Sequence, residues 1–378
     1  MQKLERVLYI TYDGLLEPLG QSQILTYLIK LANDFDITII SFEKPSDWKN
    51  IANVKVVKDN IFKSKIKWIH LSYSTKPYVL STLFDILKGI LKSYFIIKKN
   101  KINIVHTRSY IPALIAYKLS FFLNFQFIFD MRGFWADERI EWGIWKRKNF
   151  LYYFFKFLEK KFYLKSNVVI SLTNDAVEEI LTENNLEKSK FYVIPTCTNL
   201  NLFKSKNHHN EKFILSHIGA VSTRYEFSKV FEFFNILDNI LPSEFLVINK
   251  GEHKFIKKHF NISNIKISKF KLFEAKYIEV QKYINQSSAG IFFPKEGNYL
   301  KAYFPTKLGE YLACGKPIVC GKINQDVEKI INENNVGVII KNYSKESLIL
   351  GSKKIINLSL DEDTKDRCRK VAEKYFSV

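Results

Sequence analysis

Short apolar runs alternate with helix-like stretches along almost the whole chain. At the amino end, residues 5–11 (ERVLYIT) and 36–42 (DITIISF) predict strands, and residues 22–34 (SQILTYLIKLAND) predict a helix between them. A glycine-containing loop, YDGLLEPLGQ, joins the first strand to that helix. Such alternation is typical of a parallel sheet covered by helices and therefore predicts an α/β fold.

The pattern continues through the first half of the chain and predicts a Rossmann-like domain over residues 1–203. Strands are expected at 102–107, 126–131, 167–172 and 191–196, and helices at 111–123, 149–165 and 175–184. The polar stretch CTNLNLFKSKNHHNEK has no such pattern. It predicts a linker after Pro195 and before about residue 211.

The second half repeats the alternation and predicts another Rossmann-like domain over residues 211–360. Strands are expected at 213–219, 244–251, 264–270, 289–294 and 335–340, with helices at 228–240 and 275–287. Residues 361–378 predict a charged helix, which we expect to pack back on the first domain. Its acidic start, Asp361 to Asp363, suits the helix dipole better than it indicates a metal site.

Composition supports two globular domains. The chain has 378 residues, which is more than one core usually serves, and 47% of them are hydrophobic. The four cysteines are scattered and the seven histidines show no ligand spacing. The sequence therefore predicts neither a disulfide framework nor a metal site.

No apolar segment of signal-peptide type stands at the amino end, so we expect a cytoplasmic protein. The most lipid-like stretch, residues 110–131, is interrupted by Lys118, Asn124 and Gln126. A helix followed by a strand explains it better than a membrane span.

The net charge of +20 would suit nucleic acid, an anionic lipid surface or a polyanionic substrate, although codon bias also raises lysine content. Basic side chains outnumber acidic ones about three to one between residues 51 and 165. No RNA-recognition or helix-turn-helix signature is present, so we do not expect a nucleic-acid partner. Residues 88–101 and 146–165 interleave lysines with aromatic and aliphatic residues. They predict peripheral binding to anionic lipid, unless these apolar side chains belong to the core.

The stretch YFPTKLGEYLACGKPIV predicts a turn and helix cap at Pro305 and Thr306, and a short helix over residues 307–314. Gly315 would end the helix and residues 317–320 would form a strand. The first turn of such a helix can receive a diphosphate. Glu310, one turn further on, suits hydroxyl groups, but the segment alone leaves open that it is a solvated surface residue.

Four stretches together carry a family resemblance: YDGLLEPLGQSQ, FDMRGFWADER, VIPTCTNLNLF and FPTKLGEYLACGKPIV. In this order the chain resembles the GT-B fold of retaining glycosyltransferases related to sucrose and glycogen synthases, glycosyltransferase family four. It is most similar to the bacterial polysaccharide-assembly members. The resemblance covers almost the whole chain and implies two facing Rossmann-like domains with a C-terminal crossover helix.

The resemblance implies a donor site mainly in the second domain. Glu310 would accept hydrogen bonds from the nucleotide ribose, and the helix start at Thr306, Lys307 and Leu308 would contact the diphosphate. Gly20 would belong to the first-domain loop that closes over the diphosphate, and Arg224, Lys250 and Lys301 would supply further positive charge. Cations and N–H dipoles can stabilise the departing diphosphate, so no metal or cofactor is expected.

Three positions depart from the pattern of many relatives. Ala302 stands where they carry a second glutamate, Asp130 where they place a histidine, and Asn199 where they often show aspartate. We expect Asp130 to act as acceptor base or to steer the transferred sugar, or else to be a buried structural partner of Arg132.

The other first-domain candidates lie near Asp130 in the sequence or on the same predicted rim. Arg132 would pair with Asp130 or bind an acceptor phosphate. Asp137 and Glu138 are reserve bases. His106 ends another strand on this rim, in a catalytic or a structural role.

The expected function is retaining transfer of a sugar from a UDP- or GDP-linked donor to a lipid-linked or growing glycan in cell-surface polysaccharide synthesis. The enzyme would lie on the inner face of the plasma membrane. A sugar-nucleotide epimerase of the same fold is the alternative, and a basic nucleic-acid-binding protein is the third hypothesis.

Overall fold

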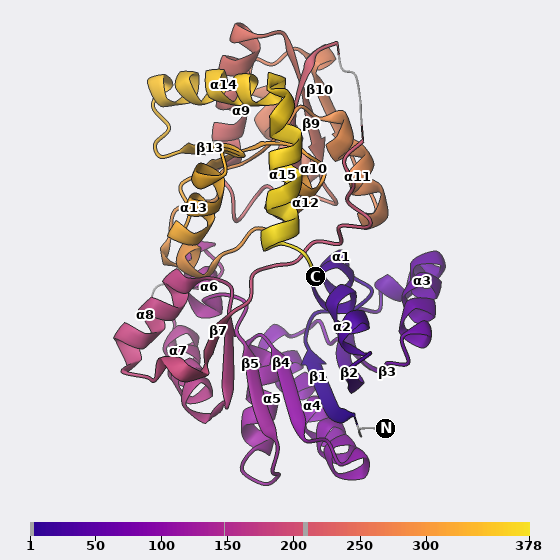
Figure 1. Ribbon diagram of the computed structural model, residues 1–378. Helices are drawn as coiled ribbons and strands as arrows, with labels where there is room; N and C mark the ends of the chain where they lie inside the picture. The colour runs from indigo at the N-terminus through magenta and orange to yellow at the C-terminus, as the bar shows by residue number, and fades with distance from the viewer. Residues whose placement is uncertain (1–3, 147, 207–210) are drawn as a thin grey trace. The chain divides into compact units, whose positions relative to one another are not determined.

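A computed structural model of the chain describes residues 4–146, 148–206 and 211–378. The chain divides between Ile194 and Pro195 into two compact units. Each unit is built on one parallel sheet with helices packed against it (Figure 1). The predicted α/β class with two Rossmann-like domains is confirmed.

The first unit contains a seven-stranded parallel sheet in the order β3-β2-β1-β4-β5-β6-β7. The strand order reverses at β1, because the chain first moves outward through β2 and β3 and then returns to β4 on the other side of β1. Ligands of such sheets bind beyond the carboxyl ends of the strands at this reversal. The strands are β1 Glu5–Thr11, β2 Phe35–Glu43, β3 Lys67–Ser72, β4 Ile104–Arg108, β5 Gln126–Asp130, β6 Val168–Ser171 and β7 Phe191–Val193.

Helices cover both faces of this sheet. Apolar side chains of α2, α3, β1 and β2 share one buried cluster, whereas α5 contacts α4 and α7 in another layer. The helices are α1 Pro18–Gly20, the π-helical turn η1 Gln21–Leu25, α2 Thr26–Leu31, η2 Asp47–Lys49, α3 Ile51–Lys63, α4 Tyr78–Asn100, α5 Tyr110–Leu119, α6 Trp135–Glu141, α7 Phe150–Lys165, α8 Asn174–Asn184 and η3 Lys188–Lys190.

The second unit repeats the topology with a six-stranded parallel sheet in the order β10-β9-β8-β11-β12-β13. Its strands are β8 Phe213–Ile218, β9 Ser243–Ile248, β10 Phe270–Phe273, β11 Ala289–Phe292, β12 Ile318–Gly321 and β13 Gly337–Ile340. Its helices are α9 Phe227–Ile240, α10 His253–Asn261, η4 Ile267–Lys269, α11 Tyr277–Gln286, η5 Asn298–Ala302, α12 Thr306–Ala313, α13 Gln325–Glu333, α14 Lys345–Leu360 and α15 Glu362–Tyr375.

The core of the second unit is rich in phenylalanine and lies between the sheet and α9, α10 and α14. On α12, the Tyr311 hydroxyl donates to the Ser216 carbonyl at 2.9 Å. A Cβ on Gly290 would lie 2.7 Å from the Tyr311 ring. A glycine in β11 therefore lets α12 approach the sheet closely, which places the start of α12 at the carboxyl edge.

Several sequence-based boundaries were wrong. The strand expected at 264–270 begins only at Phe270, because Asn264 has a left-handed φ of 58° and the chain turns there after α10. The helix expected from residue 22 begins at Pro18 and contains a π-helical turn. The elements that were not predicted from the sequence are β3, α3, α4, α6, α10, α13 and α14.

The last helix, α15, packs against α12 and α14 within the second unit and runs alongside α12 in Figure 1. Residues 195–203, which the sequence pattern assigns to the first domain, cluster with the second unit. Thr198 forms a bridge with Ser377, and the Arg369 guanidinium donates to the Phe203 carbonyl at 2.8 Å. Residues 207–210 of the expected linker lie outside the described residues.

Candidate functional site

Lys307 is a buried cation at the start of α12. Its side chain is 7% exposed, and its ammonium has no hydrogen-bond partner among the described residues. The Nζ atom lies 4.1 Å from the centre of the Tyr225 ring and 5.4 Å from that of Phe292. Aromatic faces compensate only part of the hydration that a buried ammonium loses, so this position is suited to an anion.

Glu310 lies one turn further along α12 and is half-buried. Burial raises the pKa of its carboxyl group to about 7, and the nearby Lys307 ammonium only partly opposes this shift. The carboxylate has no hydrogen-bond partner in the described part of the chain. Glu310 is therefore not the solvated surface residue that the sequence left open.

Two residues near Lys307 are affected by its charge, Tyr225 and His217. Burial raises the pKa of the Tyr225 hydroxyl, but the Lys307 charge, the hydrogen bond with Tyr303 and the Arg224 charge together outweigh burial and lower this pKa overall. The Tyr225 hydroxyl also lies 2.8 Å from that of Tyr303. Burial and the Lys307 charge lower the pKa of His217 to about 3, so this ring is neutral. The sequence analysis missed these residues because only the tertiary fold brings them to α12.

The loop after β8 is held by a carboxylate that the sequence analysis also missed. Glu252 accepts hydrogen bonds from the Val221 and Ser222 backbone N–H groups at 3.0 and 3.2 Å and from the Asn249 amide at 2.8 Å. Burial raises the pKa of Glu252, but a hydrogen bond from the Ser222 hydroxyl, together with those from the Asn249 amide and the two backbone N–H groups, outweighs burial and lowers the pKa overall. The loop positions Tyr225 and leaves Arg224 exposed.

The remaining predicted donor residues differ in their surroundings. Lys250 follows β9 and Lys301 lies in η5, and both side chains are exposed. Thr306 is the first residue of α12, but Pro305 is its N-cap, and no side chain caps the helix. The prediction that Thr306 caps the helix was wrong. Leu308 is fully buried, so its side chain serves packing, as does that of the buried Ala302.

In the first unit, the sheet brings three predicted residues together around Asp130. Asp130 ends β5 and is buried, and its Oδ2 lies 3.9 Å from the His106 Nε2. The Arg132 guanidinium lies 3.7 Å from Oδ1. Arg108 also approaches Oδ2, at 3.8 Å, because β4 and β5 pair Arg108 with Asp130 in register. Although burial raises the pKa of Asp130, Arg132, His106 and Arg108 together hold it below its usual value.

Two backbone positions near Asp130 are strained. Arg132 has a φ of 59° and Ser109 a φ of 69°, both in the left-handed region that favours glycine. The Ser109 N–H donates to the Asp130 carbonyl at 2.7 Å, which fixes the two strand ends against each other. Such strain is often found at ligand-binding sites.

The two reserve bases on α6 lie in a different setting. Asp137 accepts hydrogen bonds from the Tyr152 hydroxyl at 3.0 Å and from Lys156 at 3.2 Å. Lys156 also bonds to buried Glu159 at 2.7 Å, and Tyr110 donates to the same carboxylate. Asp137 thus belongs to a network that fastens α6 to α7. Glu138 is half-buried on α6.

Gly20 lies beneath the turn that follows β1. A Cβ at this position would lie 2.0 Å from the Gly14 carbonyl oxygen, so only glycine fits. The same turn is held by buried Glu43, which accepts from the Leu15 and Leu16 N–H groups at 2.7 and 3.2 Å. Glu43 is the last residue of β2, and Glu252 follows β9. Each unit therefore uses a carboxylate at or just beyond the end of its second strand to hold the loop after its first strand.

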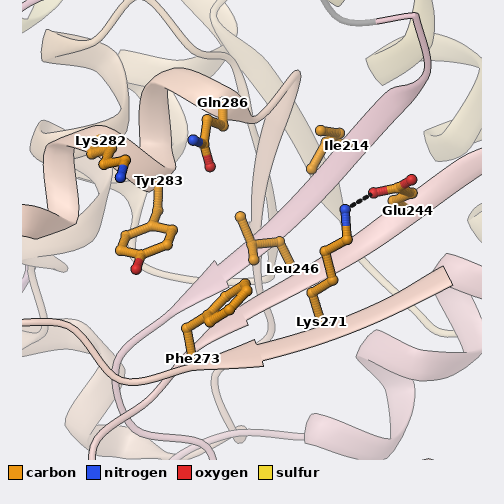
Figure 2. A pocket seen from close by; sticks show the side chains of 8 residues that line it. All are labelled: Ile214, Glu244, Leu246, Lys271, Phe273, Lys282, Tyr283 and Gln286. Carbon is orange, nitrogen blue, oxygen red and sulfur yellow. Dashed lines mark hydrogen bonds and ion pairs between the residues drawn. The ribbon is translucent and has the colours of Figure 1, made fainter. Parts of the chain in front are cut away.

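A pocket of about 360 Å³ lies elsewhere in the second unit, between α11 and strands β8 to β10 (Figure 2). Phe273 and Tyr283 stack at 5.6 Å between ring centres, and Lys271 pairs with Glu244 at 2.6 Å. None of the residues predicted from the sequence lines it. The residues that line it are Ile214, Glu244, Leu246, Lys271, Phe273, Lys282, Tyr283 and Gln286.

The described residues contain neither a metal site nor a helical membrane span. Among them, no three His, Cys, Asp or Glu side chains are placed to hold a metal ion. No helix in residues 4–146, 148–206 and 211–378 combines the length and apolar character that crossing a membrane requires.

Comparison with known proteins covers both units. Residues 22–202 match the family model described as "Glycosyltransferase Family 4", and residues 199–375 match "Glycosyl transferases group 1". A search of curated proteins gives no match.

Solved structures share the fold along nearly the whole chain. A glycosyltransferase from Rickettsia africae ESF-5 is 19% identical, with a TM-score of 0.71 over 99% of this chain and 94% of that chain. A sucrose-phosphate synthase from Thermosynechococcus elongatus is 13% identical, with a TM-score of 0.71 over 99% and 95%. Anabaena HepE in complex with UDP and glucose is 12% identical, with a TM-score of 0.69 over 98% and 95%. At these identities the likeness shows the fold, which is GT-B.

Proposed function

Because this chain is a glycosyltransferase with a family 4 domain followed by a group 1 domain, we propose that it is a retaining hexosyltransferase. It moves a sugar from a nucleoside diphosphate donor to a lipid-linked or growing glycan in cell-surface polysaccharide synthesis. The observation that carries the donor class is the buried, unpartnered ammonium of Lys307, one helical turn from the unpartnered carboxylate of Glu310. A nucleoside diphosphate offers a partner to each.

The diphosphate would bind at the start of α12, where Lys307 adds a fixed positive charge to the helix dipole. The Glu310 carboxylate would accept hydrogen bonds from the two ribose hydroxyls. Arg224, exposed on the loop beside Tyr225, would add charge as the sugar departs. A UDP-linked donor is supported by HepE, whose structure contains UDP and glucose. GDP is the other nucleotide to compare.

Positive groups around the leaving diphosphate support a mechanism that needs no metal ion. Negative charge grows on the diphosphate as the sugar leaves, and an ammonium fixed in a dry site stabilises that growth. We propose that the departing phosphate assists attack of the acceptor on the same face of the sugar, which retains the anomeric configuration. Asp130 and Arg132, in the first unit, would serve the acceptor.

A donor screen tests this function. The purified chain is incubated with UDP- and GDP-linked hexoses, with and without a lipid-linked acceptor, and the products are identified by mass spectrometry and NMR. Acceptor-dependent release of the nucleoside diphosphate, with a product of the donor's anomeric configuration, is expected. Conversion of the donor sugar without acceptor would instead identify an epimerase, and an inverted product would overturn the retaining mechanism.

We also propose that the first unit binds the inner membrane surface. Helix α4 exposes a stripe of large apolar side chains spaced three or four residues apart, namely Leu80, Phe84, Leu87, Leu91 and Phe95. Lys92, Lys98 and Lys99 are exposed on the same helix, and its single acidic residue, Asp85, is buried. An apolar stripe beside uncompensated lysines fits an anionic bilayer. On α7 the apolar side chains do not all face outward. Four of them are buried core residues, namely Phe155, Leu158, Phe162 and Tyr163.

A further inference from the structure

The charged groups around Asp130 are not balanced. Arg108 has two carboxylates near it, because its Nε lies 3.4 Å from Asp13 and its NH1 lies 3.8 Å from Asp130. Arg132 has only the 3.7 Å contact with Asp130 among the described residues. One carboxylate is thus shared by two guanidinium groups, and Arg132 is the one whose charge is left without a full partner.

The hydrogen bonding of the same side chains is also incomplete. The contacts of Asp130 with its three basic neighbours are all longer than 3.5 Å. The Asp130 Oδ1, the Arg108 NH1 and the His106 Nε2 are buried without a hydrogen-bond partner in the described residues. Buried polar atoms of proteins are nearly always paired, so three orphaned atoms at one place call for an explanation. An oxyanion can accept a hydrogen bond from the Arg108 NH1, and a sugar hydroxyl group can donate one to the Asp130 Oδ1, so a ligand that carries both groups explains these atoms.

The backbone is strained at the residue that carries the unbalanced charge. Arg132 adopts a φ of 59° directly before Gly133, whose φ is 144°. A left-handed arginine costs free energy, and the surrounding structure must enforce it. The turn lies beyond the carboxyl end of β5, at the edge where parallel sheets bind their ligands. The Arg132 side chain is 14% exposed, so it can be reached from solvent.

We propose that Arg132 binds an oxyanion of the acceptor substrate, while Arg108 and His106 hold Asp130 beside it. A guanidinium presents parallel N–H donors that match the two oxygens of a phosphate or carboxylate. The oxyanion is either a phosphate ester, as in a lipid-linked acceptor, or the carboxylate of an acidic sugar. Its assignment to the acceptor rests on the proposed function, but binding of the oxyanion can be measured separately.

Calorimetric titration of inorganic phosphate, inorganic pyrophosphate and glucuronate into the full chain tests the proposal. Saturating UDP or GDP is present to fill the site at Lys307. If neither nucleotide binds, which would count against the proposed function alone, the titrations use the Lys307→Gln chain. Arg132→Gln and Arg132→Lys are compared with wild type. Arg6→Gln is the matched control, because Arg6 lies at the start of β1 and donates to the Asn100 carbonyl at 2.8 Å.

We expect Arg132→Gln to weaken oxyanion binding about tenfold or more, as loss of a charge-assisted hydrogen bond requires. Arg132→Lys should restore part of it, and Arg6→Gln should bind like wild type. Loss of phosphate or pyrophosphate binding supports a phosphate-ester acceptor, and loss of glucuronate binding supports an acidic sugar. The proposal is overturned if wild type binds none of the three, or if folded Arg132→Gln binds them as tightly as wild type.

Discussion

Lys307 and Glu310 lie one helical turn apart on α12, yet in the described part of the chain no ion pair joins their side chains. Opposite charges at this spacing on a helix commonly interact. The Lys307 ammonium instead lies over the Tyr225 ring, and the Glu310 carboxyl group has a pKa raised to about 7 by burial. Two opposite charges held apart at a helix start are suited to a ligand that carries both an anion and hydroxyl groups.

The raised pKa of Glu310 predicts that nucleotide affinity depends on pH. Only the ionised carboxylate accepts from both ribose hydroxyls, so affinity for a nucleoside diphosphate should rise as pH increases through about 7. Titration calorimetry of UDP or GDP at several pH values measures this. Glu310→Gln should lack this component of the pH dependence and keep only the part due to the phosphate itself. Identical pH profiles for the two proteins would contradict the assignment.

The same shift predicts an opposite effect on stability. The folded-state pKa of Glu310 is raised above the unfolded value, so the stability gained by protonation is fully present below about pH 4.5 and is lost as pH rises through about 7. Glu310→Gln mimics the neutral form. In denaturant unfolding at pH 8 it should be more stable than wild type, by up to about 3 kcal/mol. A less stable variant at pH 8 would mean that the carboxylate has a partner in the free protein.

Replacing Lys307 separates binding from stability. Lys307→Met keeps the length of the side chain and removes its charge, so affinity for a nucleoside diphosphate should fall about ten- to a hundredfold. The buried ammonium has no hydrogen-bond partner among the described residues, so the free energy of unfolding should not fall. Lys353→Met, at an exposed position of α14, is the matched control. An unstable Lys307→Met protein with normal affinity would show that the ammonium is a structural group.

The alternation of apolar runs was enough to predict most of the sheets. Strands such as β11 and β12 are buried on both faces, so each appears in the sequence as a continuous apolar run. β3 was missed because it is an edge strand whose residues are half-buried or exposed. Helix α13 was missed because only Val327, Ile330 and Ile331 are buried in its short span.

The candidate site could be predicted only where its residues are close in the sequence. Lys307 and Glu310 share one motif, so the sequence pointed to both. Arg108 was missed because its approach to Asp130 depends on the register of β4 against β5, which a single sequence does not contain. Tyr225 reaches Lys307 through the loop held by Glu252, again a tertiary relationship.

The close packing around Gly20 predicts that this position requires glycine. In Gly20→Ala the new Cβ would meet the Gly14 carbonyl oxygen at 2.0 Å, so the turn after β1 must move. The free energy of unfolding should fall by about 1–3 kcal/mol, measured by chemical denaturation. Leu19→Ala, at the exposed neighbouring position, should change it by less than about 1 kcal/mol. Equal effects of the two substitutions would show that this turn is not tightly packed.

The exposed stripe on α4 predicts salt-sensitive membrane binding. Wild type should sediment with liposomes that contain anionic lipid, and less so at high salt, because the lysine contribution is screened. Phe84→Ser, Leu87→Ser and Leu91→Ser combined should abolish sedimentation. Ile262→Ser with Ile267→Ser, two exposed positions of the second unit, is the control. A wild type that stays in the supernatant, or dimerises through the stripe instead, would exclude a membrane as its partner.

Asp130 gives the sharpest test of the first unit, because catalytic and structural roles predict different outcomes. Its pKa is held low despite burial, so it is ionised at neutral pH and can accept a proton or a hydrogen bond from a hydroxyl group. Asp130→Asn should lose most turnover and keep its affinity for the nucleoside diphosphate.

Stability measurements complete the comparison. The folded-state pKa of Asp130 is depressed, so the carboxylate stabilises the fold above its unfolded pKa, and this contribution disappears as pH falls. Asp130→Asn should therefore lower the unfolding free energy at pH 7 by about 1–3 kcal/mol, because it leaves Arg108 and Arg132 without their shared anion. Steady-state rates and denaturant unfolding at pH 7 give both quantities. A stable variant with a near-normal rate would exclude Asp130 as the base, and a destabilised variant with a near-normal rate would assign it to structure alone.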